Sequence, residues 1–276
     1  MVIFNKIIKN TFHPKIGSIW CLHRVVPVRS EFKDNRDLEI TPDFLEVLID
    51  EKRRLGFRFV DLDTFVSSAS GIPFKRKLIH ITFDDGFEDV YLNAYPIFKK
   101  YHIPFTLYLS TGFPDNNADL WWLQLEHMAQ GDSEWFKKTM RQIYQSDMNP
   151  AEAMHAITTS KKDASLCHRL SLSWEQVREM VSSGLCLVGS HGVSHSALPY
   201  LSKEDAQMEL QRSQRRLNDM LGLEVRHFSY PYSKFNDVTN QLVWQSGYRT
   251  AVLGFGGQTR FQKGNRLFYR EFIVQP

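Results

Sequence analysis

Short apolar runs alternate with amphipathic stretches along most of the chain. The runs are rich in β-branched and aromatic residues and are too short for helices, so they predict buried strands. The stretches between them carry apolar residues at helical spacing, which predicts helices that cover the strands. We expect strands close to residues 17–26, 57–60, 79–85, 103–109, 185–189, 225–230, 248–253 and 268–274.

Capping residues mark where several of the helices begin. Thr41 stands directly before Pro42, an order typical of the first turn of a helix. Ser173 and Ser202 stand in the same way before amphipathic stretches. We expect the helices over about 42–55, 89–101, 174–184, 203–221 and 236–246, with a further short one that opens near residue 61.

The alternation is interrupted between about residues 113 and 170. Trp121 and Trp122 begin a helical stretch there, and the rest of the segment is polar and helix-prone. The segment is too long for a simple connection between a strand and a helix. We therefore expect one domain over 1–276 with a helical insertion at about 113–170.

Roughly eight strands that alternate with helices favour an α/β fold, an irregular parallel (β/α)7-8 barrel. A doubly wound open sheet would show the same alternation. That fold usually carries a glycine-rich first turn that binds a nucleotide, and this chain has none. We therefore expect the barrel, with its functional residues at the carboxyl ends of the strands.

Composition excludes several classes of function. The 276 residues include 34 basic and 31 acidic ones, and a net charge of +3 gives no reason to expect a nucleic-acid partner. No run approaches the roughly 20 apolar residues of a membrane helix, and the first ten residues are broken by lysines, which favours a helix packed on the domain. The three cysteines lack metal-ligand spacing, as expected of reduced thiols. We expect a cytoplasmic protein, and nothing in the composition indicates its oligomeric state.

Two polar clusters follow apolar runs and together predict a metal site. The run 79–83 leads into Asp84 and Asp85, and the run 185–188 leads toward His191 and His195. Adjacent carboxylates repel each other in a partly dry pocket unless a cation lies beside them. One carboxylate with two imidazoles leaves coordination positions open, as catalytic zinc sites do. Each cluster alone is common by chance, but as a pair they predict a divalent metal held by Asp85, His191 and His195.

Such a site suits hydrolysis of an amide. A bound divalent ion activates water and polarises a carbonyl, and Asp84 would accept the proton of the attacking water. The leaving amine then needs an acid, for which His23 and His227 are the candidates near predicted strand ends, although His227 reads better as a structural residue.

The residues also resemble those of the polysaccharide deacetylase family, carbohydrate esterase family four. The resemblance covers about 18–112 and 171–274, outside the insertion. It implies that Asp84 is the base, that Asp85, His191 and His195 bind the metal, and that the backbone N–H of Tyr232 stabilises the oxyanion. The family's Thr-Phe-Asp-Asp-Gly, His-x-x-x-His and Pro-Tyr motifs are matched by Thr82-Phe83-Asp84-Asp85-Gly86, by His191 with His195, and by Pro231-Tyr232.

Two motifs of the family depart from its pattern here. Its arginine two residues before the proline is replaced by Ser229, so another residue must orient the base, with Arg270 and Arg24 as candidates. Its late Leu-x-His motif does not follow Pro231, but 21–23 resembles that motif moved to the front, as in the circularly permuted subgroup. This resemblance makes His23 our choice for the general acid.

We expect a metal-dependent hydrolase that removes an N-acetyl group from an N-acetylated sugar, a precursor of a surface polysaccharide. Zinc is the metal we expect, with Co²⁺, Ni²⁺ and Mn²⁺ as alternatives. Trp121 and Trp122 would stack on sugar rings or anchor the insertion. A deformylase or other small-amide hydrolase is one alternative function, and a non-catalytic metal-containing carbohydrate-binding protein is another. The residues expected at the substrate are Trp121, Trp122, Pro231 and Arg270.

Overall fold

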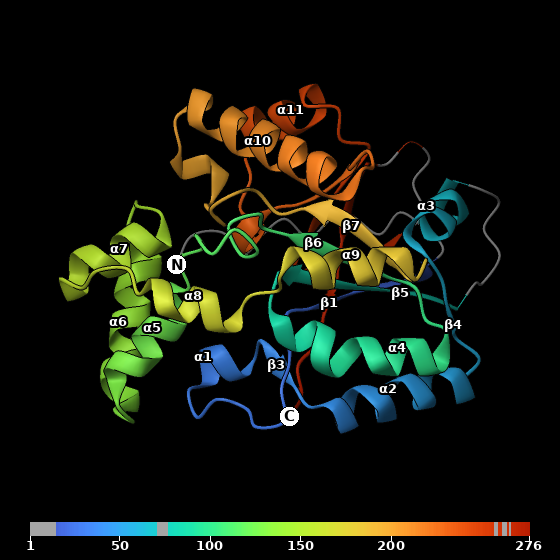
Figure 1. Cartoon of the computed structure of the whole chain (residues 1–276), viewed down its shortest axis with the longest axis horizontal. Helices are drawn as coiled ribbons and strands as arrows, with labels where there is room; N and C mark the ends of the chain where they lie inside the picture. The colour runs from blue at the N-terminus through green and yellow to red at the C-terminus, as the bar shows by residue number, and fades with distance from the viewer. Residues whose placement is uncertain (1–14, 71–76, 257–258, 261–263, 265) are drawn as a thin grey trace.

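A parallel sheet, nearly closed into a barrel, forms the centre of the molecule (Figure 1). The computed structural model describes residues 15–70, 77–256, 259–260, 264 and 266–276. The main strands pair in parallel with their spatial neighbours, which confirms the predicted α/β barrel. In spatial order the strands are β1 (Lys15–Leu22), β5 (Leu78–Asp85), β6 (Phe105–Leu109), β7 (Cys186–Ser190), β8 (His227–Ser229), β9 (Thr250–Leu253) and β11 (Leu267–Tyr269).

The last segment of the chain links the two ends of this sheet. β11 pairs with β9, and β12 (Glu271–Phe272) pairs in parallel with β1, where Trp20 lies opposite Glu271. Arg270 alone separates β11 from β12. The two short strands on either side of Arg270 therefore bring the two ends of the sheet together. The remaining strands are short: β4 (Arg58–Phe59) pairs with β5, β10 (Thr259–Arg260) pairs antiparallel with β1, and β2 (Arg24–Val25) pairs with β3 (Glu39–Ile40).

Strand register brings the polar ends of β5 and β7 to the same level. All eight residues of β5 are buried, as expected for a strand covered on both faces. Asp85 lies opposite Leu109 of β6, and Leu109 lies opposite Ser190 at the end of β7. His191 follows Ser190 directly, so the carboxylates and the first imidazole emerge at one edge of the barrel.

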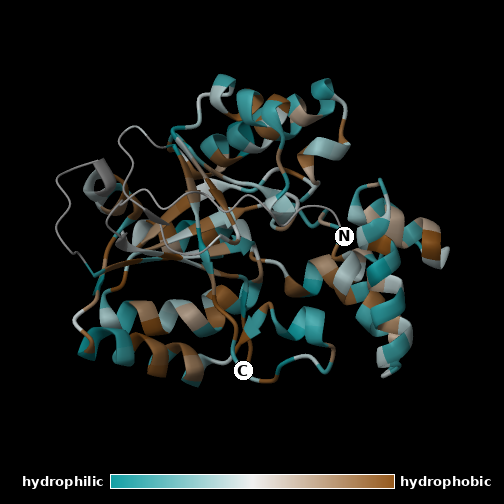
Figure 2. Cartoon of the chain, turned by 180° about the vertical axis from the view of Figure 1, so that it is seen from behind, coloured by the Kyte–Doolittle hydropathy of each residue, from teal (hydrophilic) through white to brown (hydrophobic). Residues whose placement is uncertain are grey.

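Helices surround the sheet, with apolar and hydrophilic residues along each of them (Figure 2). The predicted caps are confirmed, since the side chains of Thr41, Ser173 and Ser202 accept hydrogen bonds from the first turns of their helices. The covering helices are α2 (Pro42–Arg54), α3 (Leu62–Ser70), α4 (Tyr95–Tyr101), α9 (Trp174–Ser182), α10 (Lys203–Leu221) and α11 (Asp237–Gln245).

One expected helix begins differently. The stretch expected over about 89–101 opens as a π-helical segment, η1 (Val90–Ala94), before α4. Pro96 lies at the second position of α4 and has no N–H to donate to the preceding turn. The wider π-helical turn of η1 therefore loses no hydrogen bond at Pro96.

The insertion is helical, as its sequence predicts, and lies to one side of the barrel in Figure 1. Its apolar side chains belong to the same buried cluster as those of the barrel. The ring of Phe136 packs 4.4 Å from that of Phe32, and the ring of Trp122 packs 6.2 Å from that of Phe87, measured between centroids. Its helices are α5 (Trp121–Ala129), α6 (Ser133–Gln145), α7 (Pro150–Thr158) and α8 (Ala164–Leu170).

Among the residues described, no helix combines the length and the apolar character that a membrane crossing requires. The helix expected over the first ten residues falls outside the described part of the chain.

Candidate metal centre and active site

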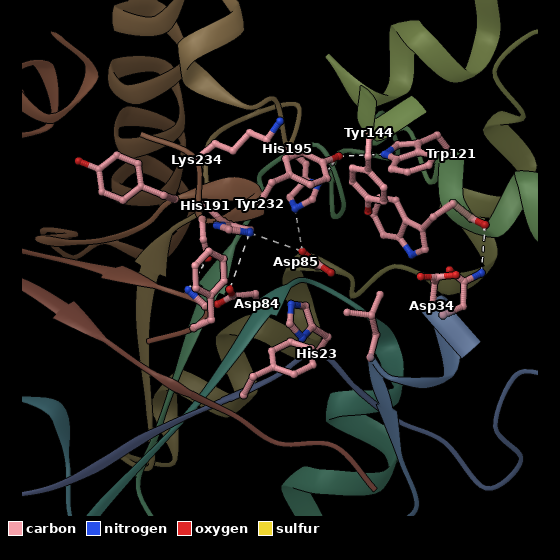
Figure 3. A pocket seen from close by; sticks show the side chains of 18 of the residues that line it. His23, Asp34, Asp84, Asp85, Trp121, Tyr144, His191, His195, Tyr232 and Lys234 are labelled. Atoms are coloured by element: carbon pink, nitrogen blue, oxygen red, sulfur yellow. Dashed lines mark hydrogen bonds and ion pairs between the residues drawn. The ribbon is translucent and has the colours of Figure 1, made fainter. Parts of the chain in front are cut away.

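The predicted site residues meet at the carboxyl ends of the barrel strands. Asp84 and Asp85 end β5, His191 follows β7, and His23 follows β1. Together with His195 they line one cavity of about 390 Å³. Figure 3 shows both imidazoles turned toward the carboxylates, with His23 on the other side of Asp85 from His195.

Three ligand atoms converge at one point of this cavity. The Oδ1 atom of Asp85 lies 3.5 Å from Nε2 of His191 and 3.2 Å from Nε2 of His195. This oxygen is buried and has no hydrogen-bonding partner. One buried carboxylate oxygen and two imidazole nitrogens within 4.8 Å of one another fit a divalent metal ion. The side chains present therefore suit the metal that the sequence predicts.

The far side of each imidazole is held by a further hydrogen bond. Nδ1 of His191 lies 2.8 Å from the backbone oxygen of Ser229, so this nitrogen carries the proton and Nε2 keeps its lone pair. Nδ1 of His195 lies 3.1 Å from the hydroxyl of Tyr232. Both rings are therefore fixed with Nε2 facing Asp85, as metal ligands require.

Backbone strain is concentrated at the same place. Four of the eight described non-glycine residues with positive φ are Asp85, His195, Tyr232 and Ser233. Left-handed conformations at such residues cost energy and persist where the surrounding structure enforces them, which is common at functional sites. Gly86 follows with φ of 139°, and a Cβ there would lie 2.5 Å from a methyl group of Leu109, so only glycine fits after the two aspartates.

The guanidinium group of Arg270 binds the carboxylate of Asp84. Its guanidinium donates to both oxygens of Asp84, at 2.7 and 2.5 Å, and its NH2 group also donates to the hydroxyl of Ser229. That hydroxyl donates in turn to Asp84. Burial alone would raise the pKa of Asp84, but the charge of Arg270, the neighbouring His191 and His23, and the hydrogen bonds from Arg270 together outweigh it, and the pKa is lowered. Asp84 is therefore an ionised, oriented carboxylate.

This contact changes the expectation for Arg270. We expected it at the substrate, but its side chain is 0% exposed and it is not among the residues that line the cavity. Arg24, the other candidate to orient the base, instead pairs with Glu39 and Asp89. The guanidinium beside Asp84 thus comes from the segment that completes the barrel, and Ser229 stands where the family has its arginine.

His23 and Tyr232 both line the cavity. Nδ1 of His23 is buried without a partner, and burial lowers the pKa of this imidazole. His227, the other candidate acid, is buried at the start of β8 and does not line the cavity; its Nδ1 lies 2.8 Å from the hydroxyl of Thr250, as expected of a structural histidine. The catalytic roles of His23 and Tyr232 stay predictions.

The paired tryptophans stand between the barrel and the insertion. Both are buried and both line the cavity. Nε1 of Trp121 donates to the hydroxyl of Tyr232 at 2.9 Å, while the ring of Trp122 lies 5.5 Å from that of His195. They therefore anchor the insertion and also form a wall of the site. Pro231 is buried and does not line the cavity.

Several residues of the cavity have no signal in the sequence. Lys234 lines one side of it, and Asp34 lies across from it in Figure 3. The wall on the side of Asp34 comes from α1 (Lys33–Arg36) and from α5 and α6 of the insertion. Lys234 follows a recognisable motif by two residues, but the others lie in segments that the motifs do not reach. They are Asp34, Asn35, Met140 and Tyr144.

Comparison with known proteins identifies related sequences. The sequence profile of the family described as "Polysaccharide deacetylase" matches residues 71–251. YxkH of Bacillus subtilis (strain 168) is 23% identical over 71% of this chain and 51% of its own length. The poly-beta-1,6-N-acetyl-D-glucosamine N-deacetylase of Staphylococcus epidermidis is 29% identical over 33% of this chain and 31% of its own length. The chain thus spans about half, or less, of these curated relatives.

Solved structures share the fold over nearly the whole chain. The deacetylase PplD of Streptococcus pyogenes, solved with acetate, superposes with a TM-score of 0.68 at 22% identity and covers 95% of this chain and 93% of its own. IcaB from Ammonifex degensii gives a TM-score of 0.66 at 23% identity, with the same coverage. At these identities the likeness concerns the fold, including the barrel that carries the site.

Proposed function

Since the chain belongs to the polysaccharide deacetylase family, we propose that it is a metal-dependent hydrolase that removes the acetyl group from an N-acetylated sugar. The observation that carries the proposal is Asp84, a second buried and ionised carboxylate beside the three predicted metal ligands. A site that only bound a metal and a sugar would have no use for it. A hydrolase needs such a group to accept the proton of the attacking water.

Each residue has a role in this proposal. A divalent ion held by Asp85, His191 and His195 would supply Lewis acidity for the acetyl carbonyl and for water. Asp84 accepts a proton from the water that adds to the acetyl carbon. His23 donates a proton to the nitrogen as the carbon–nitrogen bond breaks, so that acetate and a free amine leave. The N–H of Tyr232 donates to the carbonyl oxygen as negative charge develops there.

The substrate we propose is an N-acetylhexosamine unit of a surface polysaccharide or of its precursor. The name of the staphylococcal relative specifies a polymer of N-acetylglucosamine. Lys234 supports a phosphate-linked precursor, because this basic residue lines the cavity and its ammonium group contacts Tyr200 and forms no ion pair with a described carboxylate. We propose zinc as the metal because two imidazoles and one carboxylate suit it.

Acetate release tests the proposal. Zinc-loaded protein, chelated protein and the Asp84→Asn variant are incubated with N-acetylglucosamine oligomers and with nucleotide-linked and lipid-linked N-acetyl sugars. Asp84→Asn should retain the metal and lower acetate release by about 10² to 10⁴-fold, because it removes the base while keeping an oxygen that Arg270 can bind. Asp147→Asn, which alters an exposed carboxylate that does not line the cavity, is the matched control and should keep the activity.

The alternatives give different results in the same assay. Formate release from N-formyl sugars, without acetate release, would identify a deformylase. Tight binding of the sugars and a full complement of metal, with no release by any loaded protein, would identify a carbohydrate-binding protein. Acetate release that Asp84→Asn leaves unchanged would contradict the role given to Asp84.

A further inference from the structure

Unpaired polar atoms gather in the cavity. Seven buried side-chain polar atoms in the described part of the chain lack a hydrogen-bonding partner, and four of them belong to residues that line the cavity. Two of the four already have a use, because Oδ1 of Asp85 faces the predicted metal and His23 is the predicted acid. The other two are Nε1 of Trp122 and Oδ1 of Asn35.

These two atoms belong to two buried residues that are joined by a hydrogen bond from the side chain of Asn35 to the backbone of Trp122. Asn35 is 2% exposed and Trp122 is 5% exposed. The amide nitrogen of Asn35 donates to the backbone oxygen of Trp122 at 3.1 Å and also to the carboxylate of Glu126 at 2.5 Å. Because two acceptors hold the nitrogen, the orientation of the amide is fixed and its oxygen is left over. α1 and α5 are thus joined so that one acceptor and one donor remain free.

Trp122 and Asn35 line the same cavity as the predicted metal ligands. The ring of Trp122 lies 5.5 Å from that of His195, while Asp34 and Tyr144 line the same cavity. A sugar whose acetamido group reached the metal ligands would therefore extend its ring along this wall.

The chemistry of the two atoms selects the kind of group they bind. The indole nitrogen can only donate, and the amide oxygen can only accept. An acetyl carbonyl offers only an acceptor and an amide N–H only a donor, so neither satisfies both atoms alone, and a methyl group offers neither. A hydroxyl offers both, so one hydroxyl or two neighbouring ones would satisfy the wall. Leaving such buried groups unpaired is unfavourable, and a site that does so in its free state discriminates against ligands that lack the partner.

We propose that Trp122 and Asn35 form a subsite that reads ring hydroxyls of the sugar carrying the acetamido group. This inference rests on the proposed function for the identity of the ligand. It makes the junction of α1 with the insertion, and not the barrel, the determinant of which N-acetyl sugar is accepted. Trp122 and Asn35 act through hydrogen bonds to hydroxyls and take no part in proton transfer.

Binding to a catalytically silenced protein tests the subsite. Zinc-loaded Asp84→Asn protein, with and without Trp122→Phe, is titrated with the methyl glycoside of N-acetylglucosamine and with its 3-, 4- and 6-deoxy analogues. With Trp122 present, at least one deoxy analogue should bind about tenfold more weakly than the parent sugar. With Trp122→Phe, the parent should bind about tenfold more weakly and the same deoxygenation should have no further effect.

Controls separate this role from a structural one. Trp174→Phe, in α9, removes an indole N–H that donates to Asp115 and should leave the whole series unchanged. Asn35→Ser removes the amide oxygen and should abolish the same discrimination, which keeps the test available if Trp122→Phe does not fold. If Trp122→Phe weakens all four sugars but keeps their ratios, or if no deoxy analogue differs from the parent, the wall faces water and the proposal is wrong.

The outcome is independent of the proposed reaction. Acetate release by the unmutated protein is measured in parallel with the same glycosides. Release without hydroxyl discrimination overturns the subsite and leaves the deacetylase proposal standing. Discrimination without acetate release, either from these glycosides or from the oligomers and the nucleotide-linked and lipid-linked sugars, overturns the deacetylase proposal and retains the subsite.

Discussion

The barrel floor of the cavity, which carries Asp84, Asp85, His191 and His195, differs from the helical wall in how most of its polar groups are held, although Oδ1 of Asp85 also lacks a hydrogen-bonding partner. On the floor, both oxygens of Asp84 and the Nδ1 atoms of both metal-site imidazoles have hydrogen-bonding partners. On the wall, Trp122 and Asn35 each keep one buried polar atom without a partner. A floor whose groups are already oriented is ready for chemistry before any sugar arrives. A wall with unpaired groups is completed only by its ligand, so reaction type and substrate choice are set by different regions.

The largest effect should come from removing a floor ligand. Asp85→Asn weakens the charge that holds the divalent ion, so metal content should fall and acetate release should drop by more than about 100-fold. Metal analysis of the purified protein and acetate assays measure both. His155→Gln is the matched control, since His155 pairs with Asp119 in the insertion and should leave both values unchanged. A variant without metal that kept full activity would contradict the predicted centre.

A smaller loss of turnover should follow from changing Arg270, which orients the predicted base Asp84. Arg270→Met leaves Asp84 as a buried carboxylate without its partner, which should lower the free energy of unfolding by about 3 to 5 kcal/mol. Arg270→Lys retains the charge but loses the planar fork, so acetate release should fall by up to about 100-fold through misplacement of Asp84. Urea unfolding and acetate assays measure these effects. Equal activity of Arg270→Lys and the unmutated protein would show that the orientation of Asp84 is unimportant.

The smallest effect concerns the side of the cavity formed by Lys234. Lys234→Met should weaken turnover of nucleotide-linked sugars by up to about fivefold at low salt and leave neutral oligomers unaffected. Steady-state kinetics on both substrates give the comparison. Lys203→Met, on the exposed first turn of α10, serves as the control. An equal loss on neutral oligomers would exclude recognition of phosphate by Lys234.

Local patterns were enough to predict the floor. The fully buried strand that ends in Asp84 and Asp85 is continuous in sequence, and the two histidines follow a second strand that is mostly buried. In a parallel barrel the ends of the strands meet at one edge, so the fold predicts that these clusters come together. The helices 42–54 and 203–221 could be predicted equally well from the sequence, because a capping residue stands directly before each of them.

The partners of these residues could not be predicted in the same way. Arg270 lies 186 positions from Asp84, and its place depends on how the last segment crosses from β9 to β1. The contact between Asn35 and Trp122 spans 87 positions and depends on how the insertion packs against α1. Side-chain orientation at such junctions follows from tertiary packing and not from hydrophobic period, so neither motif nor periodicity reveals it.

The position of Arg270 ties two properties of the molecule together. The predicted metal ligands come from β5 and the segment after β7, whereas the group that orients the base comes from the seam where β11 gives way to β12. Fraying of that seam would release Arg270 from Asp84 but would leave β5 and β7, which carry or precede the three ligands, paired with β6. Such a partly opened chain would hold its metal and be inactive. The measured turnover would then show whether β11 and β12 are in place, whereas the metal content would not.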